Sequence, residues 1–160
     1  MLEGQDPRAA GVRDVSGGGS AGARGRVFQL LAVLWLLVIW GQSLLPADWS
    51  GAESGRLLAL VQGLLPWMTE HILRKTAHFT EYAVLGGLIF GTFARGKHAA
   101  AREALLAGLL AAMFDETIQL FVPGRSGQIT DVWLDFAGFA LGYFLCRGIA
   151  RAKQKKSKKI

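Results

Sequence analysis

Residues 27–45 read VFQLLAVLWLLVIWGQSLL, a run of 19 amino acids without a charged side chain. A helix of that length spans roughly 28 Å at about 1.5 Å per residue, which is enough to cross the hydrocarbon core of a bilayer. A cleaved signal peptide is the competing interpretation, but the run is longer than the apolar segment of such peptides and no small-residue cleavage site follows it. The run therefore predicts a first membrane span that ends at Pro46.

Three further apolar runs follow, over residues 76–94, 103–122 and 129–146. Together with the first run they predict an all-α fold, a polytopic membrane helix bundle with four transmembrane helices. Residues 56–65 are apolar but too short to span, and they predict a short interfacial helix after the first span. Residues 123–127, PGRSG, predict a tight turn between the third and fourth spans.

The charged residues are concentrated at the two ends of the chain. Residues 1–26 and 147–160 hold 11 of the 18 Lys and Arg residues. We therefore divide the chain into a disordered basic tail over 1–25, a transmembrane domain over 26–147 and a lysine-rich tail over 148–160. The single cysteine, Cys146, excludes a disulfide scaffold and a cysteine-rich zinc site.

The distribution of basic residues predicts the topology. With four spans, 14 Lys and Arg residues lie on the side of the two termini and four on the other side. Because positive charge is retained in the cytoplasm, both termini are expected to be cytoplasmic. The basic tails are then expected to lie against anionic lipid headgroups. No aromatic interleaving or recognised module accompanies the tails, so we expect no nucleic-acid partner.

This topology brings the polar residues of three spans to one level near the outer face. They are His78, Glu81, Asp115, Glu116, Gln119, Asp131 and Asp135. Spacing supports convergence, because His78, Glu81 and Tyr82 share one helix face and Asp131 and Asp135 share another. Gly138 and Gly142 continue the stripe of Asp131 and Asp135, so that stripe is expected to pack closely inside the bundle.

Ionisable side chains within a bilayer cost roughly 2.5 to 3.5 kcal/mol each on insertion scales, and they mark functional sites by default. We therefore predict a binding site open to the outer leaflet, with Arg74, Lys75 and Arg125 as the cations at that level. Arg125 is expected to bridge acids of the third and fourth spans. The predicted binding residues are Lys75, His78, Glu81, Tyr82, Asp115, Glu116, Gln119, Arg125, Asp131 and Asp135.

Two alternatives to a ligand site stay open. The cluster could serve as a polar clasp that holds the helices together without a ligand. It could also bind a metal, through the helical pair His78-x-x-Glu81 or through carboxylates that coordinate Mg²⁺ or Ca²⁺. One clustered histidine is little for zinc, and we expect no metal and no cofactor.

At these positions the sequence resembles the VanZ-like family of bacterial membrane proteins, named after a teicoplanin-resistance accessory protein. The matching segments are 74–82 (RKTAHFTEY), 115–119 (DETIQ), 123–126 (PGRS) and the pair Asp131 and Asp135. Asp135 stands where the family pattern more usually has Asn. The resemblance implies a small multi-pass protein of the bacterial inner membrane that is linked to glycopeptide tolerance, and it implies no established reaction.

Three functions are compatible with these features. The first is a non-enzymatic protein that binds an envelope lipid precursor or a glycopeptide-type ligand at the outer face. The second is an intramembrane enzyme acting on a lipid-linked substrate, with His78 and Glu116 as catalytic acid and base. The third is a transporter component or proton relay that uses the carboxylates. Nucleophile-elbow, P-loop and HExxH motifs are absent from the sequence, and we favour the first function.

Overall fold

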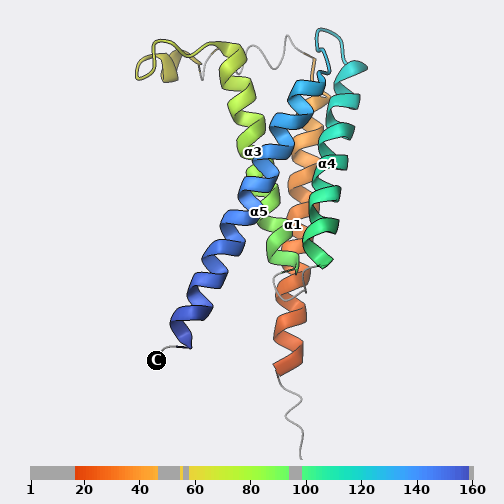
Figure 1. Ribbon diagram of the computed structural model, residues 1–160. Helices are drawn as coiled ribbons and strands as arrows, with labels where there is room; N and C mark the ends of the chain where they lie inside the picture. The colour runs from red at the N-terminus through yellow and green to blue at the C-terminus, as the bar shows by residue number, and fades with distance from the viewer. Residues whose placement is uncertain (1–16, 47–54, 56–57, 94–98, 159–160) are drawn as a thin grey trace, which may run out of the picture.

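The computed structural model describes residues 17–46, 55, 58–93 and 99–158, and over these residues the fold is all-α, without strands. The long helices are α1 (Gly17–Ser43), α3 (Glu70–Phe93), α4 (Ala99–Leu120) and α5 (Ile129–Ser157). They run up and down alternately, so the start of α1 and the end of α5 lie at one end of the bundle (Figure 1). The opposite end holds the helical residues 58–62, the start of α3 and the α4–α5 connection.

Helix α1 begins earlier than the apolar run that predicted it. It starts at Gly17, so the prediction of a disordered tail is wrong for residues 17–25, and residues 1–16 lie outside the described residues. The segment holds five glycines, which disfavour helix, beside two alanines and one arginine. An existing helix nevertheless extends at low cost, because each added residue gains a backbone hydrogen bond. Of the predicted helix over 56–65, residues 58–62 are helical and 56–57 lie outside the described residues.

The most extensive helix contact joins α3 and α5, and it depends on glycines of both helices. A Cβ atom at Gly142 would overlap the carbonyl oxygen of Ala83, and one at Gly86 would overlap the carbonyl oxygen of Phe139. Gly138 likewise lies against the backbone of Phe79. The close packing predicted for the Gly138–Gly142 stripe is therefore confirmed, because small residues let the two backbones approach.

Helices α1 and α4 complete the bundle through aromatic side chains. Trp35 Nε1 of α1 donates a hydrogen bond of 2.9 Å to the carbonyl oxygen of Glu81. Tyr82, fully buried, donates from its hydroxyl to the carbonyl oxygen of Ala111 at 3.1 Å. The ring centroids of Trp40 and Phe114 lie 4.6 Å apart across α1 and α4. These contacts pack α1 against both α3 and α4.

The outer surface of the bundle is apolar. Two helices are long and apolar enough to cross a membrane by length and composition: α1 over Ala23–Ser43 and α5 over Ile129–Ser157. Only 11% of the apolar window in α1 and 33% of that in α5 is buried inside the protein, so these are not core helices of a soluble globule. Their exposed leucine, valine and phenylalanine side chains need a lipid environment.

Candidate functional site

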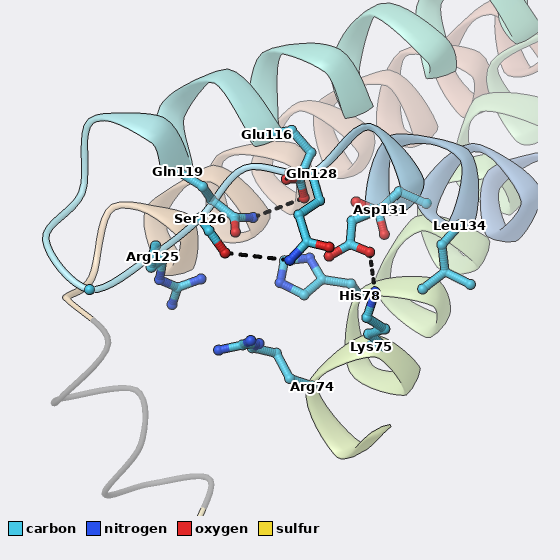
Figure 2. A pocket seen from close by; sticks show the side chains of 12 residues that line it. Arg74, Lys75, His78, Glu116, Gln119, Arg125, Ser126, Gln128, Asp131 and Leu134 are labelled. Atoms are coloured by element: carbon cyan, nitrogen blue, oxygen red, sulfur yellow. Dashed lines mark hydrogen bonds and ion pairs between the residues drawn. The ribbon is translucent and has the colours of Figure 1, made fainter. Parts of the chain in front are cut away.

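A polar pocket opens at the end of the bundle opposite the start of α1 and the end of α5 (Figure 2). Its cavity volume of about 40 Å³ admits a small polar group. Helices α3, α4 and α5 and the α4–α5 connection contribute its walls. The lining residues are Arg74, Lys75, His78, Glu116, Gln119, Gly124, Arg125, Ser126, Gln128, Asp131, Leu134 and Asp135.

Each wall of the pocket is held by an interaction between elements. Lys75 of α3 forms an ion pair with Asp131 of α5. Glu116 of α4 accepts a hydrogen bond of 2.8 Å from the backbone N–H of Gln128, just before α5 begins. Glu116 also accepts from the amide of Gln119 at 3.3 Å. The pocket is therefore a defined part of the fold, fixed on three helices.

Arg125 does not make the contact that the sequence analysis predicted. Its guanidinium donates hydrogen bonds to the carbonyl oxygens of Leu45 (2.9 Å) and Gln42 (3.0 Å) at the end of α1. Among the described residues no carboxylate lies within ion-pair distance of it. The expected bridge between acids of α4 and α5 is thus wrong, because the last carbonyls of a helix lack intrahelical donors and attract a cation.

Arg74 and Arg125 lie on the same open side of the pocket, as Figure 2 shows. Burial lowers the pKa of the Arg125 guanidinium, and the neighbouring charge of Arg74 lowers it further. Arg74 is exposed and has no ion-pair partner in the part of the chain that the structure describes. Two positive charges therefore meet at the mouth without a carboxylate between them.

Deeper in the bundle lie His78, Asp115 and Asp135, one from each of α3, α4 and α5. The two aspartates are 0% and 1% exposed. His78 Nδ1 lies 3.7 Å from Asp115 Oδ2, beyond hydrogen-bond distance. Gln119 donates to Asp115 at 3.4 Å, and the buried hydroxyl of Ser43 lies on the α1 side of the same carboxyl.

Three of the predicted binding residues do not line the pocket: Asp115, which lies deeper in the bundle, and also Tyr82 and Glu81. Tyr82 is a core residue between α3 and α4, as its hydrogen bond to Ala111 requires. Glu81 is half-buried and does not line the pocket; its backbone is the acceptor for Trp35 of α1. The spacing that predicted one shared face does not give the two side chains one neighbour: the Glu81 carboxyl lies beside Gln42 of α1, whereas His78 lies beside the aspartates of α4 and α5.

The pocket also contains residues that the sequence analysis did not select. Ser126 and Gln128 line it, and they join each other through a hydrogen bond of 3.4 Å. Both belong to the connection between α4 and α5, where Gly124 adopts a φ of 75°. Ser126 lies in the predicted turn over 123–127 and Gln128 directly follows it. This position was the available signal, since a turn between two helices that carry site residues must border the site.

A family model described as VanZ/LLP1 matches residues 28–151. The chain belongs to the VanZ/LLP1 family. The match covers α3 and α4 completely, α1 from residue 28 onward and α5 up to residue 151, and it contains every residue that lines the pocket. Comparison with curated proteins and with solved structures returned no match.

The family resemblance and the pocket coincide in this VanZ/LLP1 protein. The segments that carried the resemblance, 74–82, 115–119 and 123–126, supply most of the pocket. The remaining pair, Asp131 and Asp135, lines its α5 wall. Chemically, the mouth can bind an anion between two guanidinium groups, and the floor offers nitrogen and oxygen atoms to a cation. Membership in VanZ/LLP1 makes the chain a membrane protein of a family linked to glycopeptide resistance.

Proposed function

We propose that this VanZ/LLP1 protein binds the phosphate group of an envelope lipid in the polar pocket, at the outer face of the bacterial inner membrane. It crosses the membrane four times with both termini in the cytoplasm, and it acts by binding the lipid. The bound lipid is a precursor or carrier of the cell envelope, and its sequestration contributes to glycopeptide tolerance.

The observation that carries this proposal is the pair Arg74 and Arg125 at the mouth of the pocket. Lys75 is occupied by Asp131, but neither arginine has a carboxylate partner among the described residues. Guanidinium groups bind phosphate through paired, charge-assisted hydrogen bonds. A volume of about 40 Å³ suits the phosphate and leaves the rest of the headgroup and the chains outside.

The surroundings of the mouth favour a lipid over a water-soluble anion. Trp67 and Trp133 are 64% and 58% exposed. Trp67 lies just before α3 and Trp133 lies in the first turns of α5, and both helices lead into the pocket. Exposed tryptophans are enriched where a bilayer meets water. The arginines would then lie at the depth of lipid phosphates.

Binding of a polyprenyl phosphate by purified protein in detergent tests the proposal. The matched probe is the corresponding polyprenol, which has the same chain and no phosphate. We expect the phosphate to bind at least tenfold more tightly, because charge-assisted hydrogen bonds contribute about 1.5–3 kcal/mol each and 1.4 kcal/mol is tenfold. Arg74→Gln should remove most of this difference, whereas Arg102→Gln, an exposed arginine at the other end of α4, should retain it. Equal affinity for phosphate and alcohol would overturn the proposal.

Growth of a teicoplanin-sensitive host tests the link to tolerance. Expression of the protein should raise the concentration of teicoplanin that inhibits growth. Glu116→Gln and Arg74→Gln should reach the membrane at normal levels and lose this effect, since the first removes a charge at nearly constant volume and the second changes an exposed side chain. Full tolerance with both variants would mean that the pocket does not contribute to resistance.

A further inference from the structure

Three buried or half-buried side chains of types that commonly ligate metals lie close together beneath the pocket. His78 of α3, Asp115 of α4 and Asp135 of α5 each offer one ligand atom, and these atoms all lie within 4.8 Å of one another. The residues lie 37 and 20 positions apart in the chain, so only the helix packing brings them together. The group does not include Glu81, which the sequence analysis considered as the second metal ligand beside His78.

Four polar atoms of this group lack hydrogen-bond partners among the described residues. Within the described residues, His78 Nδ1, Asp115 Oδ1 and both carboxylate oxygens of Asp135 are buried without a hydrogen-bond donor or acceptor. A buried polar group without a partner costs several kcal/mol, and an unpaired charge costs more. The nearby cations are engaged elsewhere, Lys75 with Asp131 and Arg125 with the carbonyls of α1.

We propose that His78, Asp115 and Asp135 bind a divalent transition-metal ion such as Zn²⁺ or Mn²⁺. One imidazole nitrogen with two carboxylates is a donor set for first-row divalent ions, and two aspartates balance the charge of one such ion. The distance of 3.7 Å between His78 Nδ1 and Asp115 Oδ2 is too long for a hydrogen bond. It is close to the roughly 3.4 Å that separates two ligand atoms held about 2.1 Å from a tetrahedral zinc ion.

Neighbouring polar groups are placed to support the ligands. Gln119 donates to Asp115 Oδ2, and Ser43 of α1 lies beside the same carboxyl. Such outer partners orient metal ligands and raise metal affinity. Three protein ligands leave a coordination position free, and because His78 and Asp135 line the pocket, a ligand in the pocket can occupy that position.

The metal site is independent of the proposed lipid function, since its ligands do not include the two arginines. Protein purified in detergent without chelator should contain about one transition-metal ion per chain by elemental mass spectrometry. After EDTA treatment, added ZnCl₂ or MnCl₂ should raise the melting temperature, because an ion that binds the folded state stabilises it. MgCl₂ at the same concentration should raise it less, because a histidine ligand disfavours Mg²⁺.

Variants assign the ligands. His78→Gln, Asp115→Asn and Asp135→Asn should each weaken Zn²⁺ affinity at least tenfold. Glu81→Gln is the matched control, since it removes a carboxylate one turn from His78 and should bind Zn²⁺ like the parent protein. In metal-free buffer, Asp135→Asn should melt no lower than the parent, because it removes an unpaired buried charge; this result separates lost ligation from misfolding. Arg74→Gln should lose the lipid and keep the metal.

Two results would overturn the assignment. Absence of bound metal together with no effect of ZnCl₂ or MnCl₂ on the melting temperature would leave the group as a protonated polar clasp. A loss of Zn²⁺ with Glu81→Gln as large as that with Asp135→Asn would mean that the ligands are other residues.

Discussion

Arg125 Nε donates a hydrogen bond of 2.9 Å to the backbone carbonyl oxygen of Leu45, joining residues 80 positions apart in the chain. The same guanidinium reaches Gln42. The connection that closes the pocket is therefore anchored to the end of the first helix rather than to the acids of the pocket. This arrangement leaves the acids of the floor without a cation from the described residues, and it holds Arg125 at the mouth.

Replacing Arg125 should destabilise the protein through α1. Arg125→Ala removes two hydrogen bonds from a charged donor, and we expect it to cost about 2 kcal/mol. For a chain of this size that corresponds to a melting temperature lower by about 4–8 °C in detergent. Arg102→Ala, an exposed arginine without a partner among the described residues, is the control and should change the melting temperature little. Equal shifts would mean that the α1 contact contributes nothing.

Cysteine labelling should reveal the orientation of the bundle. In a Cys146→Ala background, Ser126→Cys at the pocket end should react with a membrane-impermeant maleimide in intact spheroplasts. Ser157→Cys at the end of α5 should react only after lysis. Both positions are exposed in the structure, so burial does not limit the reaction. The reverse pattern would place the pocket in the cytoplasm and exclude an outer-leaflet lipid.

A methyl group at Gly142 should force α3 and α5 apart. Gly142→Ala places a Cβ against the carbonyl oxygen of Ala83, and backbone cannot move aside as a side chain can. We expect a loss of about 1–3 kcal/mol, typical of overpacking. Gly148→Ala on the same helix meets nothing within 4 Å and should stabilise by about 0.5–1 kcal/mol through helix propensity. The two melting temperatures should therefore move in opposite directions, and a common direction would contradict the close contact.

The Lys75–Asp131 pair should be coupled energetically. The two side chains are 28% and 21% exposed, so solvent screens the pair partly and we expect a coupling of about 1 kcal/mol. Lys75→Met and Asp131→Asn are measured singly and together by thermal unfolding. The double variant should be more stable than the sum of the single losses predicts, since each single change leaves one member of the pair without its partner. Strict additivity would show that the pair is screened completely.

Sequence patterns predicted the helices well because helix formation depends on local composition. The apolar runs over 103–122 and 129–146 correspond to α4 and α5, and 76–94 to α3. The ends were less accurate. α3 starts at Glu70 and α5 continues to Ser157, because charged residues such as Lys155 and Lys156 extend a helix beyond its apolar run. Hydropathy detects only the part of a helix that lies in lipid or in the protein core. It does not detect the polar turns that continue the same helix.

The convergence of His78, Glu116 and Asp131 also followed from the sequence, because alternating helices of similar length place residues of equal depth together. Which partner each of them takes did not follow. Spacing along α3 put His78 and Glu81 on one face, yet the crossing of α3 and α5 turns His78 toward Asp135 and leaves Glu81 outside the pocket. A rotation of one residue, about 100°, changes the neighbouring helix, and only packing determines it.

The sequence by itself therefore determined an all-helical membrane protein, its VanZ-like family and the end of the bundle where its polar residues gather. Helix periodicity, apolar length and charge placement are local properties and can be read without coordinates. Tertiary structure alone decided that Arg125 holds α1 instead of an acid, that Lys75 pairs with Asp131, and that His78, Asp115 and Asp135 share one buried space. These outcomes depend on how closely glycines such as Gly142 let α3 and α5 approach, because that distance sets which side chains can touch.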